Sequence, residues 1–195
     1  RIYDYTNIES PCFKSVKNGS SYEIRLYGSV NAEAWSTAVA LDGAMMEATE
    51  AGFHLNFAYI EGANSESKKI PMTTPVLAAP TNTSDASWNV SFFVPTSLYP
   101  DPSTAPAPTN SKVLIERVPS TGLAFAVTEF GGFATYDQFV STEKALRSAL
   151  QADGVNVVKA DAGVKLGRIY AQYDSPFTLF GRHNEVWLQL ADQNQ

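Results

Sequence analysis

Two prolines, Pro71 and Pro75, constrain the backbone of this chain more than any other feature. They lie between a pattern of apolar residues typical of a helix and a pattern typical of a strand. Because a proline ring disfavours helical backbone in the residue before it, Ile70 and Thr74 are expected to be extended. Proline also lacks the N–H group that the centre of a sheet requires. The sequence therefore predicts a strand over residues 70–79 that lies at a sheet edge or at a bulge.

The first half of the chain predicts two strands, a helix and two more strands. Tyr22, Ile24 and Leu26 alternate with more polar neighbours, which is the period of two expected of a half-buried strand. Apolar residues then recur every three or four positions between Asp42 and Gly62, as on one face of a helix. Further apolar residues beside that face predict that most of this helix is covered. The elements are expected at residues 22–27, 30–35, 42–62, 70–79 and 88–94.

The second half repeats this order of elements, although few residues are identical between the halves. Strands, a helix and two further strands are expected at residues 113–118, 123–130, 136–153, 168–173 and 185–190. We infer an α+β fold of pseudo-duplicated ββαββ units. About eight strands would form a curved sheet or a distorted antiparallel β-barrel with two flanking helices.

A chain of 195 residues is long enough for one domain and marginal for two, so we expect a single domain over 1–195. Its parts are expected to be an N-terminal arm (1–20), a first half (21–95), a stiff Pro-rich loop (96–111) and a second half (112–195). The Pro-rich loop would join the halves and would not separate two domains.

The charge of the chain excludes some classes of partner. A net charge of -6 and a pI near 4.9 disfavour nucleic acid and anionic membrane surfaces, because both select basic patches. No run of apolar residues approaches the roughly 20 residues of a membrane span. The expected partner is a small molecule or another protein.

Three glycosylation sequons favour an extracellular protein. They begin at Asn18, Asn82 and Asn89. The chain starts at Arg1 without a Met, which suggests that a leader has been removed or that the sequence has been trimmed. We expect a secreted glycoprotein, with a cytoplasmic location as the alternative. A single cysteine, Cys12, allows no internal disulfide, so it either pairs between chains or serves as a small apolar residue.

Blocks of sequence spread from about Pro11 to Leu190 have an order and spacing similar to one known family. They are Ser21–Tyr27, Gly52–Phe53 with Tyr59–Asn64, Lys69–Val76 and Asn184–Leu188. In these blocks the chain resembles the SOUL haem-binding protein family. The resemblance implies a distorted β-barrel with two flanking helices, non-enzymatic binding of haem or another porphyrin, and frequent dimers.

The chain departs from the family at the position where some members are thought to offer an axial His to haem iron. That His would fall within Glu23–Tyr27, and the residue here is Leu26. Haem iron normally takes His, Met, Cys or Tyr as its axial protein ligand. We therefore expect a pigment held by hydrophobic and aromatic contacts without the axial His. This pigment is either a tetrapyrrole such as haem or a carotenoid.

The polar residues favour neither an enzyme nor a metal site. His54 lies on the first predicted helix beside Glu47 and Glu50, and a solvated or Glu-paired His is the simpler interpretation. His183 lies in a predicted turn before the last strand. Because the chain has no pair of His at ligand spacing, no Cys cluster and no nucleophile motif, we expect no catalytic residue and no metal ligand.

Apolar and aromatic side chains are the remaining candidates for a ligand site. Small-molecule pockets are mostly apolar, and Met and aromatic side chains suit planar or polyene ligands. The candidate ligand-binding residues are Leu26, Trp35, His54, Phe57, Met72 and Phe180. The cations that could hold the propionates of a tetrapyrrole are Arg25, Lys68, Lys69, Arg168 and Arg182.

We therefore expect a non-enzymatic carrier of an apolar conjugated pigment, with a second copy or a related subunit as a dimer partner. The alternative is a ligand-free protein-interaction module on the same fold. In that case exposed apolar patches would bind the partner protein. Pigment found with the purified protein would favour the carrier, and a defined protein complex without pigment would favour the module.

Overall fold

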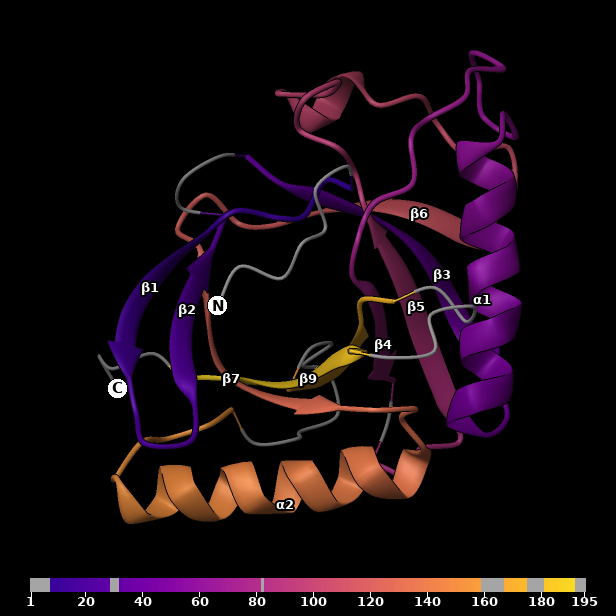
Figure 1. Ribbon diagram of the computed structural model, residues 1–195. Coiled ribbons are helices and arrows are strands. Elements are labelled where there is room, and N and C mark those ends of the chain that lie inside the picture. Colours follow the sequence, from indigo (N-terminus) through magenta and orange to yellow (C-terminus); the bar gives the residue numbers. More distant parts are fainter. Residues whose placement is uncertain (1–7, 29–31, 82, 159–166, 175–180, 192–195) are drawn as a thin grey trace.

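One curled antiparallel sheet of nine strands forms the frame of the molecule, and two helices pack against its outer face (Figure 1). The computed structural model describes residues 8–28, 32–81, 83–158, 167–174 and 181–191. The sheet curls into a half-barrel whose concave side faces away from both helices (Figure 1). The expected α+β fold with a distorted barrel and two flanking helices is confirmed.

The elements follow one another in the expected order, with one additional strand. They are β1 (Phe13–Asn18), β2 (Glu23–Tyr27), β3 (Ala34–Asp42), α1 (Met45–Ile60), β4 (Val76–Pro80), β5 (Ser87–Phe93), a 3-10 turn (Pro102–Thr104), β6 (Val113–Arg117), β7 (Leu123–Gly131), α2 (Tyr136–Ala152), β8 (Arg168–Gln172) and β9 (His183–Gln189). The additional strand is β1, which pairs with β2 inside the segment that we expected to be an arm. All six residues of β1 are exposed, so no apolar alternation marks it as a strand.

The order of strands across the sheet is symmetric about its middle. The order is β1-β2-β7-β9-β8-β4-β5-β3-β6. When β2, β3, β4 and β5 are matched with β6, β7, β8 and β9, the order reads the same outward from either side of the β4–β8 pair. The two ββαββ units are thus present in the sheet, and they join through β4 and β8.

β4 lies in the middle of the sheet, between β5 and β8, where the prolines predicted an edge. The strand begins at Val76, directly after Pro75, so residues 70–75 lie outside it. Ile70 instead donates its backbone N–H to the carbonyl oxygen of Ile60 at the end of α1. The edge prediction was wrong because Pro71 and Pro75 precede the strand and remove no hydrogen bond from its ladder.

β3 covers Ala34–Asp42, whereas the strand was predicted at 30–35. Ala, Ser and Thr make up much of β3, and these small residues hide its alternation. A bulge between Ala38 and Leu41 shifts the register with β5, and Ala40 within the bulge has a φ of 52°. The bulge lets Ala38 and Leu41 both pack in the cluster under the helices.

α1 buries one face, on Met45, Ala48 and Gly52, against β3 and β5. The prediction that this helix is covered over most of its surface was wrong. Met46 is 45% exposed and Phe57 is 40% exposed. α1 covers only the outer face of the sheet, so its own outer side meets solvent in the described part of the molecule (Figure 1).

α2 lies across the outer face of β7 and β9 (Figure 1). Its first turn is closed by a capping box, in which Thr135 and Gln138 each accept a hydrogen bond from the other's backbone N–H. Phe139, Leu146 and Leu150 are buried against the sheet.

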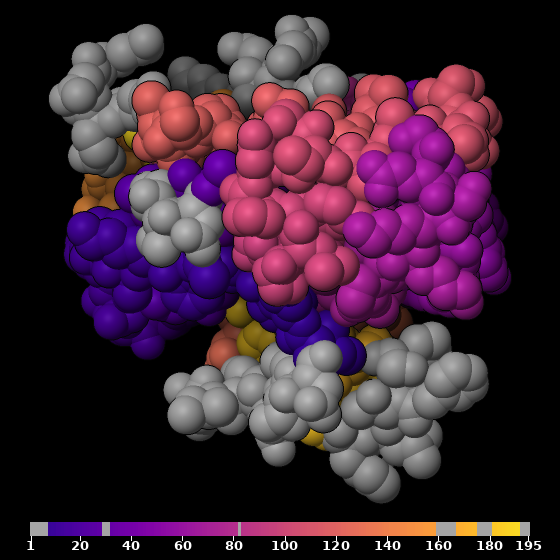
Figure 2. Space-filling model, turned by 90° about the horizontal axis from the view of Figure 1, so that it is seen from above, coloured from indigo at the N-terminus to yellow at the C-terminus, as the bar shows by residue number. Residues whose placement is uncertain are grey.

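Both faces of the sheet are buried along its interior strands, on alternate residues. On β9, Val186 and Leu188 pack under the helices, whereas Trp187 joins Phe125 and Leu77 on the concave face. The segment between β5 and β6 lies over one end of the molecule, between β1–β2 and α1 (Figure 2). No helix within the described residues is long and apolar enough to cross a membrane.

Candidate ligand-binding cavity

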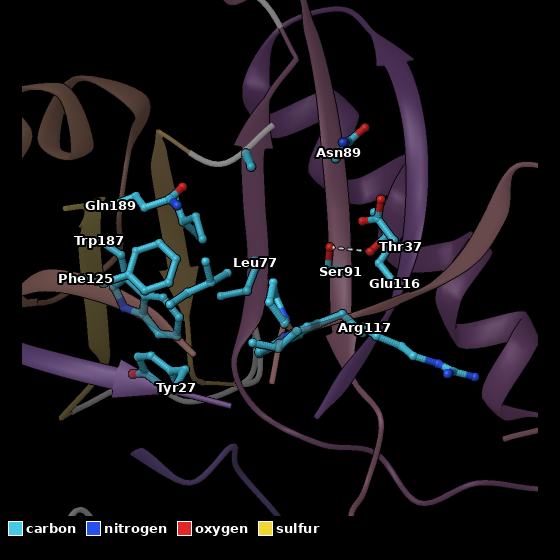
Figure 3. Close-up of a pocket in the computed structure, with 16 residues that line it drawn as sticks. Tyr27, Thr37, Leu77, Asn89, Ser91, Glu116, Arg117, Phe125, Trp187 and Gln189 are labelled. Carbon is cyan, nitrogen blue, oxygen red and sulfur yellow. Dashed lines mark hydrogen bonds between the residues drawn. The ribbon is translucent and has the colours of Figure 1, made fainter. Parts of the chain in front are cut away.

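The concave face of the half-barrel holds a cavity of about 470 Å³ (Figure 3). Side chains from every strand except β1 line it. They come mostly from alternate positions, because residues two apart point to the same face of a strand. A cavity of this volume lies within the usual range of small-molecule sites, roughly 300–1,000 Å³.

One side of the cavity is an aromatic wall, formed by Tyr27, Phe125 and Trp187 on β2, β7 and β9 (Figure 3). Tyr27 stacks on Trp187 with ring centroids 4.7 Å apart and planes 17° apart. Phe125 lies 5.7 Å from Trp187 and 6.0 Å from Tyr27. Leu77 and Ile169 belong to the same apolar cluster. This wall offers flat, polarizable surface to an apolar ligand.

The opposite side is a polar wall, formed by Thr37 of β3 and by Asn89 and Ser91 of β5 (Figure 3). Thr37 and Ser91 are paired across the strands, and their hydroxyl oxygens lie 2.9 Å apart. Asn89 Oδ1 accepts a hydrogen bond of 3.1 Å from the backbone N–H of Ala40 in the β3 bulge. The cavity is therefore apolar on one side and able to form hydrogen bonds on the other.

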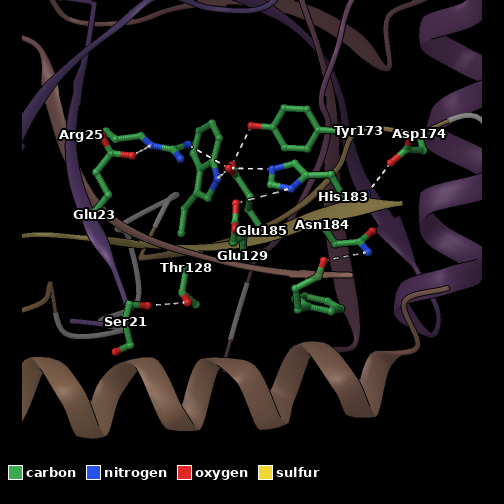
Figure 4. Close-up of polar contacts among 12 residues, drawn as sticks. Ser21, Glu23, Arg25, Thr128, Glu129, Tyr173, Asp174, His183, Asn184 and Glu185 are labelled. Carbon is green, nitrogen blue, oxygen red and sulfur yellow. Dashed lines mark hydrogen bonds and ion pairs between the residues drawn. The ribbon is translucent and has the colours of Figure 1, made fainter. Parts of the chain in front are cut away.

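Behind the aromatic wall, the buried carboxylate of Glu185 gathers four hydrogen bonds (Figure 4). Arg25 Nη1 donates to Oε1 over 2.9 Å, and His183 Nε2 lies 2.9 Å from the same oxygen. Tyr173 donates its hydroxyl to Oε2 over 2.6 Å, and Trp187 donates Nε1 over 2.7 Å. Charge-assisted hydrogen bonds of this kind are strong and directional, so they fix the indole of Trp187 in the cavity wall.

Glu185 and Arg25 stay ionised in this network although Glu185 is buried and Arg25 is partly buried. Burial alone would raise the pKa of Glu185, but the hydrogen bond from His183 and the charge of Arg25 hold it below its ordinary value. Burial opposes the charge of Arg25, yet the Glu185 carboxylate raises the pKa of the guanidinium overall. Burial raises the pKa of Tyr173, which keeps its phenol as a donor. A carboxylate and a guanidinium, both ionised, therefore lie behind the cavity.

The cavity offers haem iron little to bind. Among the described residues that line it, none is His, Met or Cys, and Tyr27 is the one Tyr. Burial raises the pKa of Tyr27, so the phenolate that binds iron is disfavoured. The described residues also contain no group of His, Cys, Asp and Glu placed to hold a metal ion. The described lining offers flat apolar surface and, apart from the buried Tyr27, no side chain of a type that usually binds haem iron.

Of the six candidate ligand-binding residues, the structure brings Trp35 to the cavity. Leu26 does not line it; the neighbouring residue, Tyr27, does. His54 and Phe57 are exposed on α1, on the opposite side of the sheet. Met72 packs against a cluster beside α1. Phe180 lies outside the described residues.

Three of the five candidate cations are paired with carboxylates. Arg25 binds Glu23 and Glu185, and Arg168 binds Asp85 and Glu143. Lys69 pairs with Glu61, the guanidinium of Arg182 lies 4.4 Å from the ring centre of Phe133, and Lys68 Nζ lies 5.6 Å from that of Tyr99. None of the five lines the cavity, whereas Arg117, which the sequence did not suggest, does.

The sequons and the cysteine occupy different environments. Asn18 is exposed at the end of β1, and Cys12 is exposed just before that strand. Asn89 is only 7% exposed and lies within β5 on the cavity wall, which disfavours it as a sugar acceptor. Asn82 lies outside the described residues.

Known proteins resemble this chain along most of its length. A family model described as SOUL heme-binding protein matches residues 8–189. Heme-binding protein 2 of Mus musculus is 29% identical over 93% of this chain and 85% of its own length, and Heme-binding protein 2 of Homo sapiens is 30% identical with the same coverage. A solved structure of a hydrolase from Listeria innocua matches with a TM-score of 0.53 at 10% identity, over 96% of this chain and 94% of that one, and shares the fold alone. The chain belongs to the SOUL haem-binding protein family.

Proposed function

We propose that this protein is a non-enzymatic carrier of an apolar conjugated pigment, bound in the cavity of the half-barrel. The observation that carries the proposal is the aromatic wall of Tyr27, Phe125 and Trp187 along a cavity of about 470 Å³. Stacked rings favour flat or extended π systems over compact ligands. Relatives named Heme-binding protein support a tetrapyrrole as the pigment. A carotenoid is the second pigment that the wall suits.

The pigment is held by contacts and not by a bond to a metal. Leu26 stands where the family resemblance implies an axial His, and the described residues of the cavity lining include no His, Met or Cys. A porphyrin without iron should therefore bind about as tightly as haem. When haem is bound it brings an iron centre, but the residues of this chain supply the apolar surface and the orientation.

Absorption spectroscopy of natively purified protein tests the proposal, followed by titration with haemin, protoporphyrin IX and a carotenoid. A Soret band identifies a tetrapyrrole, and a broad shifted polyene band identifies a carotenoid. Trp35→Ala removes a side chain of the cavity and should weaken binding about tenfold, because a buried aromatic contact contributes on the order of 1–2 kcal/mol. Phe57→Ala, on the exposed side of α1, is the control and should leave affinity unchanged.

Two results would contradict this function. Haemin bound far more tightly than protoporphyrin IX, with an iron spectrum lost in His54→Ala, would show axial ligation on the helix face. Protein that takes up none of the pigments would instead favour the interaction module. One observation supports that second candidate, since Met46 and Phe57 present apolar surface on the outer side of α1.

A further inference from the structure

The residues of the polar wall are held in place by two paired strands of the sheet. β3 and β5 are hydrogen-bonded neighbours, so Thr37 and Ser91 lie directly opposite each other. Asn89 is two residues from Ser91 on the same face of β5. Thr37 is 1% exposed and Asn89 is 7% exposed. These polar groups are fixed by central strands, and the cavity is the space that they face.

The hydrogen-bonding groups of this wall contain more donors than the protein uses. Thr37 and Ser91 share one hydrogen bond, which occupies one of their two hydroxyl hydrogens. The other hydroxyl hydrogen has no acceptor among the described residues. The side-chain oxygen of Asn89 accepts a hydrogen bond from the N–H of Ala40. The two hydrogens on Nδ2 therefore remain available to donate into the cavity. Donors that face a ligand without an acceptor cost free energy once water is displaced.

The charges beside the polar wall disfavour an anionic ligand group. Glu116 of β6 lines the cavity and lies next to Thr37 in the close-up (Figure 3). Arg117 also lines the cavity, but its guanidinium extends away from the aromatic wall (Figure 3). A ligand carboxylate at the polar wall would therefore meet a like charge. A neutral carbonyl oxygen would avoid that repulsion and could accept hydrogen bonds from the hydroxyl and amide donors of the wall.

We propose that Thr37, Asn89 and Ser91 form a subsite for a neutral carbonyl oxygen at one end of the conjugated ligand. The inference rests on the proposed function and specifies which part of the pigment faces β3 and β5. The aromatic wall takes the π system, and the donors take the carbonyl. A keto-polyene and a linear tetrapyrrole with terminal lactam carbonyls share this chemistry, whereas an unsubstituted polyene lacks it.

A matched set of retinoids tests the subsite, with quenching of Trp fluorescence as the readout. Retinal has a terminal carbonyl, axerophthene has the same polyene without oxygen, and retinoic acid carries a carboxylate. Retinal should bind at least about tenfold more tightly than axerophthene, the factor expected for one or two net hydrogen bonds. Retinoic acid should bind more weakly than retinal because of Glu116.

Variants locate the effect at the polar wall. Thr37→Val with Ser91→Ala should remove most of the preference for retinal and leave the affinity for axerophthene unchanged. Asn89→Asp keeps an oxygen for the Ala40 N–H but replaces the donor, so it should also weaken retinal binding by about tenfold. It serves as the second test if the double variant does not fold. Ser148→Ala, on the exposed surface of α2, is the control and should change nothing.

The outcomes separate the subsite from the carrier function. Equal affinity of wild-type protein for retinal and axerophthene overturns the subsite while the carrier function stands. Tightest binding of retinoic acid overturns the assignment of a neutral carbonyl. If no retinoid and none of the pigments bind, both the subsite and the carrier function are wrong. Tighter binding of canthaxanthin than of β-carotene, or binding of biliverdin that Asn89→Asp weakens, supports the subsite and identifies the source of the carbonyl.

Discussion

Glu33 carries a buried carboxyl group that lacks good hydrogen-bond partners. It is 1% exposed, and neither side-chain oxygen makes a hydrogen bond of ordinary geometry with the described residues. Burial raises its pKa to about 7, and the backbone N–H groups of Cys12 and Gly28 lower it by less. In the folded protein Glu33 therefore loses its proton only around pH 7, whereas the unfolded chain loses it near the ordinary pKa of 4.5.

Glu33→Gln should remove a pH dependence of stability. Because the folded pKa is raised, the free energy of unfolding of the wild type falls as pH rises from about 5 to about 8, by on the order of 3 kcal/mol. Glutamine has no proton to release, so the variant should lack this fall. Urea unfolding at several pH values measures both profiles. Parallel profiles for the two proteins would argue against a raised pKa of Glu33.

At the same scale, apolar alternation identified β2 but pointed to the wrong face for a ligand. Tyr22 and Ile24 pack under the helices, and Tyr27 lines the cavity. Both faces of the sheet are buried, so the apolar face of a strand need not be the ligand face. The cavity side of β2 carries Glu23 and Arg25, whose charges concealed it. Glu185, which pairs with Arg25, is distant in sequence, and no local pattern reveals that contact.

At the scale of elements, α1 packs closely on β5 at Gly52. A Cβ atom on Gly52 would lie 2.4 Å from Val90 Cβ and 2.6 Å from Leu41 Cδ1. Asn56, one turn further on, donates Nδ2 to the carbonyl oxygen of Val90 over 2.9 Å. The missing side chain allows this helix to lie on the strand, and the hydrogen bond of Asn56 depends on that distance.

Gly52→Ala should destabilise the protein although alanine favours helices. The gain in helix propensity is about 1 kcal/mol, whereas a clash with Val90 displaces α1 and costs about 1–3 kcal/mol. The displacement also stretches the Asn56 hydrogen bond. We expect a net loss of about 1–2 kcal/mol in urea unfolding. Val90→Ala should be less harmful in the Gly52→Ala background than alone, and additive effects of the two changes would contradict the close contact.

How well the sequence predicted an element depended on the residues of that element and on where its prolines lie. α2 was predicted almost to its ends because it has a clear apolar stripe. β3 was misplaced because its small residues carry a weak pattern and a bulge interrupts it. β4 was found, but its position in the sheet depends on its pairing with β8, which is distant in sequence.

At the scale of the whole molecule, the cavity belongs to both halves of the chain. Trp35 and Leu77 come from the first half, and Phe125 and Trp187 come from the second. The halves also share one sheet through β4 and β8. The repeat of elements was visible in the sequence, but the cavity was not, because it depends on how the symmetric sheet curls. Loss of either half would remove one wall of the cavity.

The two halves should therefore unfold together, and a cavity ligand should stabilise both. In a variant whose single Trp is Trp88, the fluorescence reports on the first half of the chain. In a variant whose single Trp is Trp187, it reports on the second half. Within each variant, Trp fluorescence and far-UV circular dichroism should give the same urea midpoint. A ligand at about 100 times its Kd should raise the free energy of unfolding by about 2.7 kcal/mol with both reporters, because it binds only when both walls are folded. A midpoint of Trp187 fluorescence that differs from the circular dichroism, or a ligand that shifts one reporter alone, would show that the halves are independent units.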